Sequence, residues 1–266
     1  RGAGLVPLKA LDLQDDGKEH RLRVEGDNAG STNGRYVLPS HPVTAGAFGS
    51  WKTGEAHTWR EASSTPPTAA ERAALRQRMQ AMQQARAVEQ AAVHLAARAH
   101  AQKLWAMARP AHDGHPYLQR KKIQAIGVRQ LRASLLIPLR DSVGMLHSLQ
   151  FIGADGSKRF LTGGRMAGCY FSMGVPVDRL LLCEGYATAA SLYRATGWAC
   201  AVAFNCGNLL AVARALRVKF PRMRIVVCAD NDMATPGNPG VTKATEAARA
   251  VGGYVATPRF KGVAHV

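Results

Sequence analysis

The chain has 266 residues, 47% of them hydrophobic, with 35 lysines and arginines against 18 aspartates and glutamates, a formal net charge of +17. This length and apolar fraction can bury the core of one large domain or two modest ones, which excludes a disordered basic tail. The five cysteines include no C-x-x-C pair, which excludes a disulfide scaffold, predicts no zinc site and favours a reducing, cytoplasmic setting.

No apolar run approaches the roughly 18 residues that span a bilayer, so we expect no membrane association. We also find no signal segment at the start of the chain. Because the first residue is Arg1 and not Met, the sequence leaves open that the chain is a piece of a longer protein.

The positive charge is unevenly distributed along the chain. Residues 1–65 carry eight basic and eight acidic side chains, whereas residues 109–177 carry ten basic and three acidic ones. A long polyanion is the natural partner of such a basic region, because neutralised phosphates release their condensed counterions. Nucleic acid is therefore the expected partner; the alternative is a generally basic protein whose charge only aids solubility.

Residues 1–65 are predicted to form an accessory, strand-rich region. Residues 21–25 and 35–38 have the composition of short strands, while residues 26–28 and the Asn33-Gly34 pair are typical turn signals. No catalytic constellation is visible among these residues.

Residues 66–108 are predicted to form a long helical segment, either one helix or two with a hinge. Residues 63–67 read as a break, and Thr68 with Glu71 forms a capping box at a helix start. The following residues, to about Met107, are rich in Ala, Gln, Arg and Met and contain neither Gly nor Pro. This composition is typical of a solvated, partly packed helix.

Residues 109–177 are predicted to form a mixed α+β, basic subdomain. Residues 134–139 and 146–152 are apolar strands, with a turn at residues 141–144 between them. Residues 154–165 form a turn-rich basic stretch, in which glycines beside Lys and Arg allow the backbone to approach phosphate closely.

Residues 178–266 alternate between strand and helix patterns. The expected strands are residues 179–183, 199–204, 224–229 and 254–257, and the expected helices are residues 188–195, 208–219 and 242–251. This alternation predicts an α/β fold with a mainly parallel, doubly wound sheet flanked by helices.

Acidic residues follow two of these strands directly. Glu184 comes after residues 179–183, and Asp230 and Asp232 come after residues 224–229. Sites in parallel sheets lie beyond the carboxyl ends of the strands, where three carboxylates would repel one another without a cation. Mg²⁺ prefers such hard oxygen ligands. The alternative is that the acids cap the following helices or face water.

The Glu184-Gly185 pair, which we expect to turn the chain sharply, resembles together with Asp230-x-Asp232 the Toprim domain shared by DnaG-type primases, topoisomerases and some nucleases. The string from Glu184 to Ala189, EGYATA, is similar to the signature of primases of conjugative plasmids and some phages. Further segments resemble the same primases or their basic subdomain: residues 135–141, 158–165, 203–209 and 238–248.

The resemblance, over roughly residues 110–260, implies a DNA primase catalytic core that makes short RNA primers by metal-dependent nucleotidyl transfer in plasmid or phage replication or conjugation. It implies an RNA-polymerase-type subdomain over residues 109–177 and a Toprim metal-binding domain over residues 178–266. Glu184, Asp230 and Asp232 would be the catalytic acids and hold Mg²⁺, with Mn²⁺ as an alternative. The primase zinc module and a helicase segment are not visible.

The implied partners are a single-stranded DNA template, ribonucleoside triphosphates and a helicase or other replication protein, in the bacterial cytoplasm. The candidate nucleic-acid and nucleotide ligands are basic residues: Arg120, Lys121, Lys122, Arg140, Lys158, Arg159, Arg165 and Lys243. Lys243 is a candidate for the triphosphate; its alternative is an ordinary exposed lysine in the first turn of a helix.

Two other functions remain open at this point. A Toprim-type nuclease would use the same acids to cleave nucleic acid, although the basic stretch of residues 158–165 favours a primase. A non-catalytic module would bind single-stranded DNA or dock replication proteins, although the presence of all three acids disfavours it.

Overall fold

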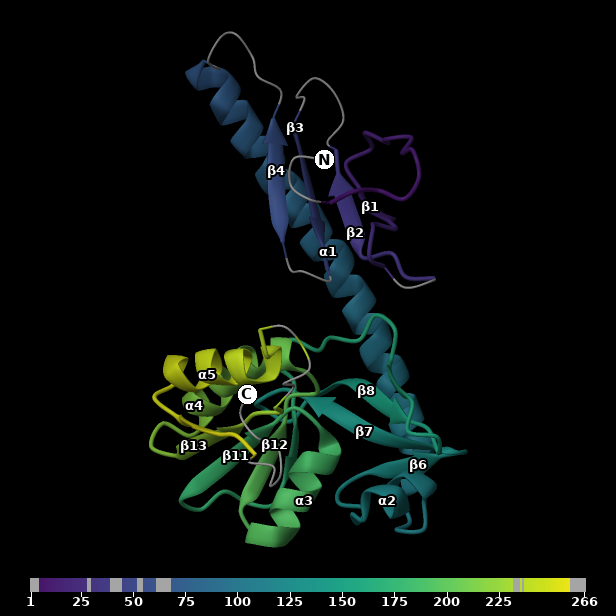
Figure 1. Cartoon of the computed structure of the whole chain (residues 1–266), viewed down its shortest axis with the longest axis vertical. Helices are drawn as coiled ribbons and strands as arrows, with labels where there is room; N and C mark the ends of the chain where they lie inside the picture. The colour runs from purple at the N-terminus through teal and green to yellow at the C-terminus, as the bar shows by residue number, and fades with distance from the viewer. Residues whose placement is uncertain are drawn as a thin grey trace. The chain divides into compact units, whose positions relative to one another are not determined.

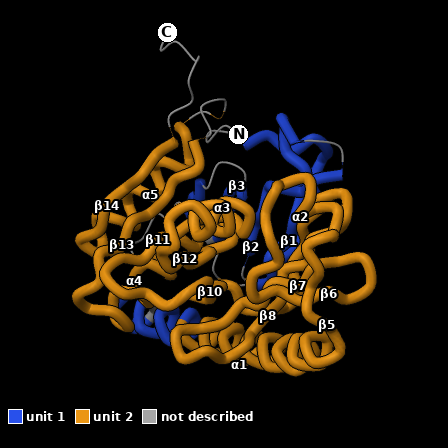
Figure 2. Tube along the Cα trace, turned by 90° about the horizontal axis from the view of Figure 1, so that it is seen from below, with its two compact units in different colours: residues 1–79 blue, residues 80–266 orange. Residues whose placement is uncertain are grey.

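The computed structural model describes residues 5–27, 30–38, 45–51, 55–60, 68–231, 235 and 237–258. The chain divides into two compact units, residues 1–79 and residues 80–266 (Figure 2). The division falls inside the helix α1 (Ala69–Met107). The finer division of the chain at residues 65, 108 and 177 stays a prediction.

The first unit contains an antiparallel sheet with the strand order β1-β2-β3-β4. Its strands are β1 (Glu19–Leu22), β2 (Gly34–Val37), β3 (Ala45–Ser50) and β4 (Ala56–Arg60). The prediction of short strands here is confirmed.

The prediction of a turn at Asn33-Gly34 is wrong, because Gly34 is the first residue of β2 and pairs with both Leu22 and Ser50. A Cβ atom at Gly34 would lie 2.6 Å from a methyl group of Val24, so glycine serves close packing within the sheet here.

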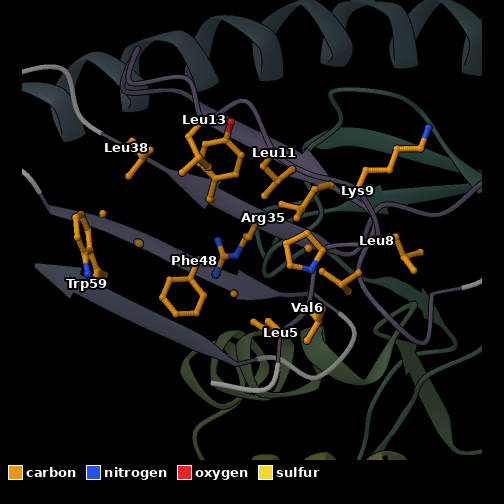
Figure 3. Close-up of a pocket in the computed structure, with 18 of the residues that line it drawn as sticks. Leu5, Val6, Leu8, Lys9, Leu11, Leu13, Arg35, Leu38, Phe48 and Trp59 are labelled. Atoms are coloured by element: carbon orange, nitrogen blue, oxygen red, sulfur yellow. The ribbon is translucent and has the colours of Figure 1, made fainter. Parts of the chain in front are cut away.

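A cavity of about 780 Å³ lies within the first unit (Figure 3). Its lining is mainly apolar, with side chains such as Leu13, Phe48 and Trp59. None of the predicted site residues lies in this lining.

The helix α1 is one continuous helix of 39 residues and begins directly after Thr68. The side chain of Glu71 lies outside the described residues, so the capping box stays a prediction. Near its carboxyl end, Ala101 packs in a buried cluster with Leu136 and Leu149. The end of α1 thus covers one face of the sheet that follows.

That second sheet is antiparallel, with the strand order β5-β6-β7-β8-β9. Its elements are β5 (Arg109–Pro110), β6 (Arg129–Leu131), β7 (Ser134–Arg140), β8 (Leu146–Ile152) and β9 (Lys158–Phe160), and α2 (Pro116–Lys121) lies between β5 and β6 in the chain. The predicted strands β7 and β8 and the turn between them are confirmed, whereas the sequence did not indicate β5, β6 or α2.

The third sheet has the order β10-β12-β11-β13-β14, and all strands but β10 are parallel. Its strands are β10 (Phe171–Met173), β11 (Arg179–Cys183), β12 (Ala199–Val202), β13 (Arg224–Cys228) and β14 (Tyr254–Ala256). Its helical elements are α3 (Tyr186–Thr196), the short 3₁₀ helix η1 (Cys206–Asn208), α4 (Leu209–Lys219) and α5 (Pro239–Ala250).

Helices cover both faces of this sheet, with α3 on one face and α4 and α5 on the other (Figure 1). Alternate residues of β11 enter the two cores: Leu181 packs with α3, and Leu182 packs with α4 and α5. A strand buried on both faces must be apolar throughout, which explains its unbroken hydrophobic run. The predicted mainly parallel α/β fold is confirmed.

Backbone hydrogen bonds join the antiparallel sheet of the second unit to the segment that leads into the parallel sheet. The backbones of Arg140 and Tyr170 exchange two hydrogen bonds, of 3.0 and 2.8 Å. Side chains from both sheets, such as Ile137 and Leu181, share one buried cluster. The predicted basic subdomain and the parallel sheet therefore share a common core.

Within the part of the chain that the structure describes, no helix combines the length and the apolar character needed to cross a bilayer. All five cysteines are free thiols, and all but Cys206 are buried.

Candidate active site

Glu184 and Asp230 lie side by side at the carboxyl edge of the parallel sheet. Cys183 pairs directly with Cys228 where β11 and β13 run together. Glu184 follows Cys183 immediately, and Asp230 lies two residues after Cys228. The strand register thus brings the two acids to neighbouring positions, and both are partly exposed.

Asp232, the third predicted acid, lies outside the described residues, so its part in the site stays a prediction. Among the residues that the structure describes, no three His, Cys, Asp or Glu side chains are grouped so that they could hold a metal ion. Glu184 and Asp230 are the predicted acids whose positions can be compared.

The first turn of α5 packs against both acids. A Cβ atom at Gly240 would overlap the backbone carbonyl oxygen of Asp230 and would lie 3.3 Å from Oε1 of Glu184. Because the amino end of a helix carries a partial positive charge, α5 stabilises negative charge on Glu184. The glycine allows this helix end to approach the carboxylate closely.

Gly185 does not have the role that the sequence predicted. Its φ of −109° and ψ of 149° are open to any residue, and a Cβ atom there would meet nothing nearer than Oγ1 of Thr188 at 3.9 Å. No sharp turn requires glycine at this position. Gly185 is instead the N-cap residue of α3.

The donor atoms at this edge fit a hard divalent cation. The carboxylates of Glu184 and Asp230 supply oxygen atoms, which Mg²⁺ prefers. Contacts with the thiols of Cys200 and Cys228, together with burial, raise the pKa of Cys183 well above its usual range. The Cys183 side chain is fully buried in the core next to the acids, so the carboxylate oxygens are the exposed donor atoms at this edge.

The basic residues of β9 point to opposite faces of the antiparallel sheet. Lys158 pairs with Ile152, and Arg159 pairs with Phe151. Ile152 belongs to the cluster shared with α3, whereas Phe151 belongs to the cluster under α1, and the Arg159 guanidinium lies 4.8 Å from the Phe151 ring. Neighbouring residues in a strand alternate between faces, so the pair cannot act as one patch.

One face of β9 reaches the carboxyl edge of the parallel sheet. Phe160 of β9 and Phe204, which follows β12, contact each other edge to face with ring centroids 6.0 Å apart. Phe204 has a φ of +73°, which is uncommon for a bulky residue and marks a constrained turn. Lys158 lies on the same face of β9 as Phe160.

The basic residues of α2 lie near the turn of the β8–β9 hairpin and near α3. Arg120 donates a 3.1 Å hydrogen bond to the carbonyl of Ala154 in the hairpin turn. Lys121 and Lys122 end the helix, and the carbonyl of Lys122 accepts a 2.9 Å hydrogen bond from Arg194 of α3. Arg120 and Lys158 thus lie at the same end of the hairpin.

Arg140 points toward α1. Its guanidinium lies 5.8 Å from the Trp105 ring and donates to the carbonyl of Gly144. Burial, followed by the charge of nearby Arg129, lowers the pKa of Arg140. Arg165 lies at the far end of the basic stretch, with a 3.4 Å hydrogen bond to the carbonyl of Ala167.

Lys243 lies in α5, three residues beyond Gly240, and forms a 2.8 Å ion pair with Glu246. The hydrogen bond to Glu246 raises the pKa of Lys243. Both side chains are about half exposed, so the pair is weak and a polyphosphate can compete for the lysine.

Two residues that join the basic subdomain to the parallel sheet were not predicted. The hydroxyl of Tyr186 accepts a 2.9 Å hydrogen bond from the amide of Ile126 and donates one of 3.1 Å to the carbonyl of Gln124. Burial raises the pKa of Tyr186 to about 12. Asn208 binds the segment before β10 through its buried side chain. Both residues lie in segments whose sequence resembles that of primases, residues 184–189 and 203–209, but these sequences do not predict the contacts.

Residues 179–258, which hold Glu184 and Asp230, match the family model described as Toprim domain. This segment is a Toprim domain. Two proteins from Escherichia coli, both named DNA primase TraC, are 38% identical to 92% of the chain, and the chain spans only 24% and 18% of their respective lengths. The chain is therefore related to the TraC primases and corresponds to about a quarter or less of each.

Solved structures with low sequence identity also match. The primase fragment of the bacteriophage T7 primase-helicase protein is 13% identical, with a TM-score of 0.44 over 58% of this chain and 66% of that one. A DnaG primase catalytic domain bound to single-stranded DNA is 15% identical, with a TM-score of 0.34 over 48% of this chain and 45% of that one.

Proposed function

We propose that this chain is the catalytic core of a DNA primase, which makes short RNA primers on single-stranded DNA. The observation that carries the proposal is the meeting of Glu184 and Asp230 at the carboxyl edge of a Toprim sheet. The relationship to two proteins named DNA primase TraC supports this activity.

The proposed reaction is nucleotidyl transfer, in which a 3′-hydroxyl attacks the α-phosphate of a ribonucleoside triphosphate and pyrophosphate leaves. Bound Mg²⁺, or Mn²⁺ as the alternative, would lower the pKa of the hydroxyl and offset charge on the transferring phosphate. Glu184 and Asp230, with Asp232, would hold the cation. Alternatively, Glu184 would accept the proton from the hydroxyl.

The basic residues would hold the substrates. Lys158, on the face of β9 that reaches the carboxyl edge, would attract the template backbone together with Arg120 and Arg165. Lys243 would exchange its ion pair with Glu246 for the triphosphate. Lys121, Lys122, Arg140 and Arg159 would contribute a more distant positive field.

The proposed setting is plasmid or phage replication or conjugation in the bacterial cytoplasm. The relatives from Escherichia coli and the five free cysteines support it. The proposed partners are single-stranded DNA, ribonucleoside triphosphates and a helicase or other replication protein.

The proposal is tested by incubating the chain with single-stranded template, labelled ribonucleotides and Mg²⁺. We expect short labelled RNA from the parent and none from Asp230→Ala, because one of the two neighbouring carboxylates is lost. Asp178→Ala is the matched control, since Asp178 is an exposed aspartate of the same domain that pairs with Arg179. It should retain synthesis.

Two outcomes would replace the primase proposal. Template cleavage without synthesis, lost in Asp230→Ala, would indicate a Toprim-type nuclease. Metal-independent binding of single-stranded DNA, unchanged in Asp230→Ala and without any reaction, would indicate a non-catalytic module.

A further inference from the structure

Asn208 is a buried polar residue at the junction of the two sheets, with only 5% of its surface exposed. It ends η1 and precedes α4. Its Nδ2 donates hydrogen bonds to the carbonyls of Met166 at 3.2 Å and Cys169 at 3.0 Å. Its Oδ1 accepts a 2.9 Å hydrogen bond from the amide of Gly168. The Asn208 side chain thus binds residues 166–169 through both its amide nitrogen and its amide oxygen.

The segment that Asn208 holds is the continuation of the basic stretch. It begins directly after Arg165 and leads to β10. Upstream, Gly164 packs so closely on β8 that a Cβ atom there would overlap the hydroxyl of Ser148. Gly163, with a φ of +73°, lies so close to Val93 of α1 that a Cβ atom would be 2.8 Å from its Cγ1. Arg165 is therefore fixed between two anchored points, the glycine pair and Asn208.

On its other side Asn208 is connected to the backbone that carries Glu184. Its Nδ2 donates a 2.9 Å hydrogen bond to the carbonyl of Ala203. The amide of Ala203 donates a 2.8 Å hydrogen bond to the carbonyl of Cys183, the residue before Glu184. A continuous chain of hydrogen bonds therefore runs from the segment after Arg165 to the strand end that presents the catalytic acid.

The chemistry of asparagine suits this junction. The two N–H groups of the side-chain amide lie within hydrogen-bond distance of three carbonyls, so that one N–H is shared, and the amide oxygen accepts from one backbone amide. Aspartate has the same shape but lacks the donors, and alanine has neither donor nor acceptor. Either replacement leaves buried backbone groups of the segment without partners, which favours its displacement.

We propose that Asn208 is a positioning residue for nucleotidyl transfer, which sets the Arg165 segment of the basic subdomain relative to the acids of the Toprim sheet. The inference rests on the proposed primase function. Without Asn208 the basic residues remain on the surface and still attract the template, but the template no longer lies in register with Glu184. The effect should therefore fall on kcat and not on DNA affinity.

The experiment compares the parent with Asn208→Ala and Asn208→Asp. We expect kcat for dinucleotide formation to fall about tenfold or more, because a misplacement of about 1 Å can cost as much as a hundredfold. The dissociation constant for single-stranded DNA, measured by fluorescence anisotropy, should stay within about twofold, because all the charges of the basic stretch are retained in Asn208→Ala.

A matched control separates positioning from loss of stability. Leu216, 1% exposed, lies on α4, the helix that begins after Asn208, and packs in the cluster beneath α4 and α5. Leu216→Ala should lower the melting temperature yet keep kcat at a temperature where both variants are folded. A fall in kcat as large in Leu216→Ala as in Asn208→Ala would overturn the proposal.

Hydrogen exchange tests the contacts of Asn208 with residues 166–169 independently of activity. In Asn208→Ala the amides of residues 166–169 should exchange faster, with no change in β13, whereas Leu216→Ala should leave the segment unaffected. Unchanged exchange in the segment, or an unchanged kcat, would overturn the proposal. A parent that makes no primer would overturn the proposed function and with it the catalytic consequence, while the exchange result would still decide whether Asn208 holds the segment.

Discussion

Gly240 illustrates, at the scale of the residue, how the absence of a side chain shapes this site. It lies in the first turn of α5, where a Cβ atom would overlap the carbonyl of Asp230 and approach Oε1 of Glu184 to 3.3 Å. The backbone carbonyl belongs to the strand end and cannot rotate away as a flexible side chain could. Glycine is needed at this position for the close approach of helix and strand.

Gly240→Ala should therefore destabilise the protein by about 1–3 kcal/mol, as overpacking usually does. In a helix with free space the same change stabilises by about 0.5–1 kcal/mol, so the sign of the effect tests the contact. Urea unfolding followed by circular dichroism measures the free energy difference. Gly207→Ala is the control, because its Cβ atom would meet only Oδ1 of Asn205 at an ordinary 3.4 Å. A Gly240→Ala variant more stable than the parent would contradict the packing described for α5.

Residues differ in how far the sequence reveals them. Glu184 and Asp230 were predictable because each follows an apolar strand, and parallel strands end at one edge. Asn208 and Tyr186 were not, since their partners lie 39–42 and 60–62 residues away in the chain. The pattern of residues 208–219 predicts a helix but not the partners of the Asn208 side chain, and Tyr186 precedes the helix predicted from Thr188. Gly185 was assigned a turn that its ordinary backbone angles do not require.

Elements were predicted best where both faces are buried. The strands β7, β8 and β11 agree with their predicted bounds to within one residue, and in β7 and β11 an unbroken apolar run marks the extent of the strand. The helix α3 begins two residues before the predicted Thr188, since Gly185 caps it without a side-chain hydrogen bond. The six-residue α2 gives too short a pattern to detect.

The alternation of β9 leads to a prediction at the scale of the element. Lys158→Glu should weaken binding of single-stranded DNA more than Arg159→Glu, although both reverse one charge. Lys158 shares a face with Phe160, which contacts Phe204 at the carboxyl edge, whereas Arg159 lies over Phe151 on the other face. Fluorescence anisotropy at several salt concentrations measures both affinities. Loss of one phosphate contact should also reduce the slope of log affinity against log salt by about 1.

Equal effects of the two charge reversals would indicate that only the overall field matters. A larger effect of Arg159→Glu would place the template on the opposite face of the sheet and contradict the path proposed along Lys158.

At the scale of the whole molecule, the structure shows which sheets and helices carry the net charge of +17. Residues 1–65 carry no net charge, and most of the excess lies in residues 109–266, which form the second, antiparallel sheet and the Toprim sheet. These two sheets share a buried cluster that includes Leu135, Ile137 and Leu181. The composition predicted a polyanion as partner; the structure adds that a basic edge strand and an acidic sheet edge lie in one compact unit.

The central claim is that the acids at the Toprim edge catalyse nucleotidyl transfer on a bound template. The most direct measurement is the rate of dinucleotide formation by the parent and by Glu184→Gln, which keeps the shape of the side chain and removes its charge. Glu89→Gln, a change of an exposed glutamate on α1, is the control. We predict a loss of about a hundredfold or more in Glu184→Gln, unchanged affinity for single-stranded DNA, and the parent rate in Glu89→Gln. A Glu184→Gln variant that forms dinucleotides at the parent rate would contradict the claim.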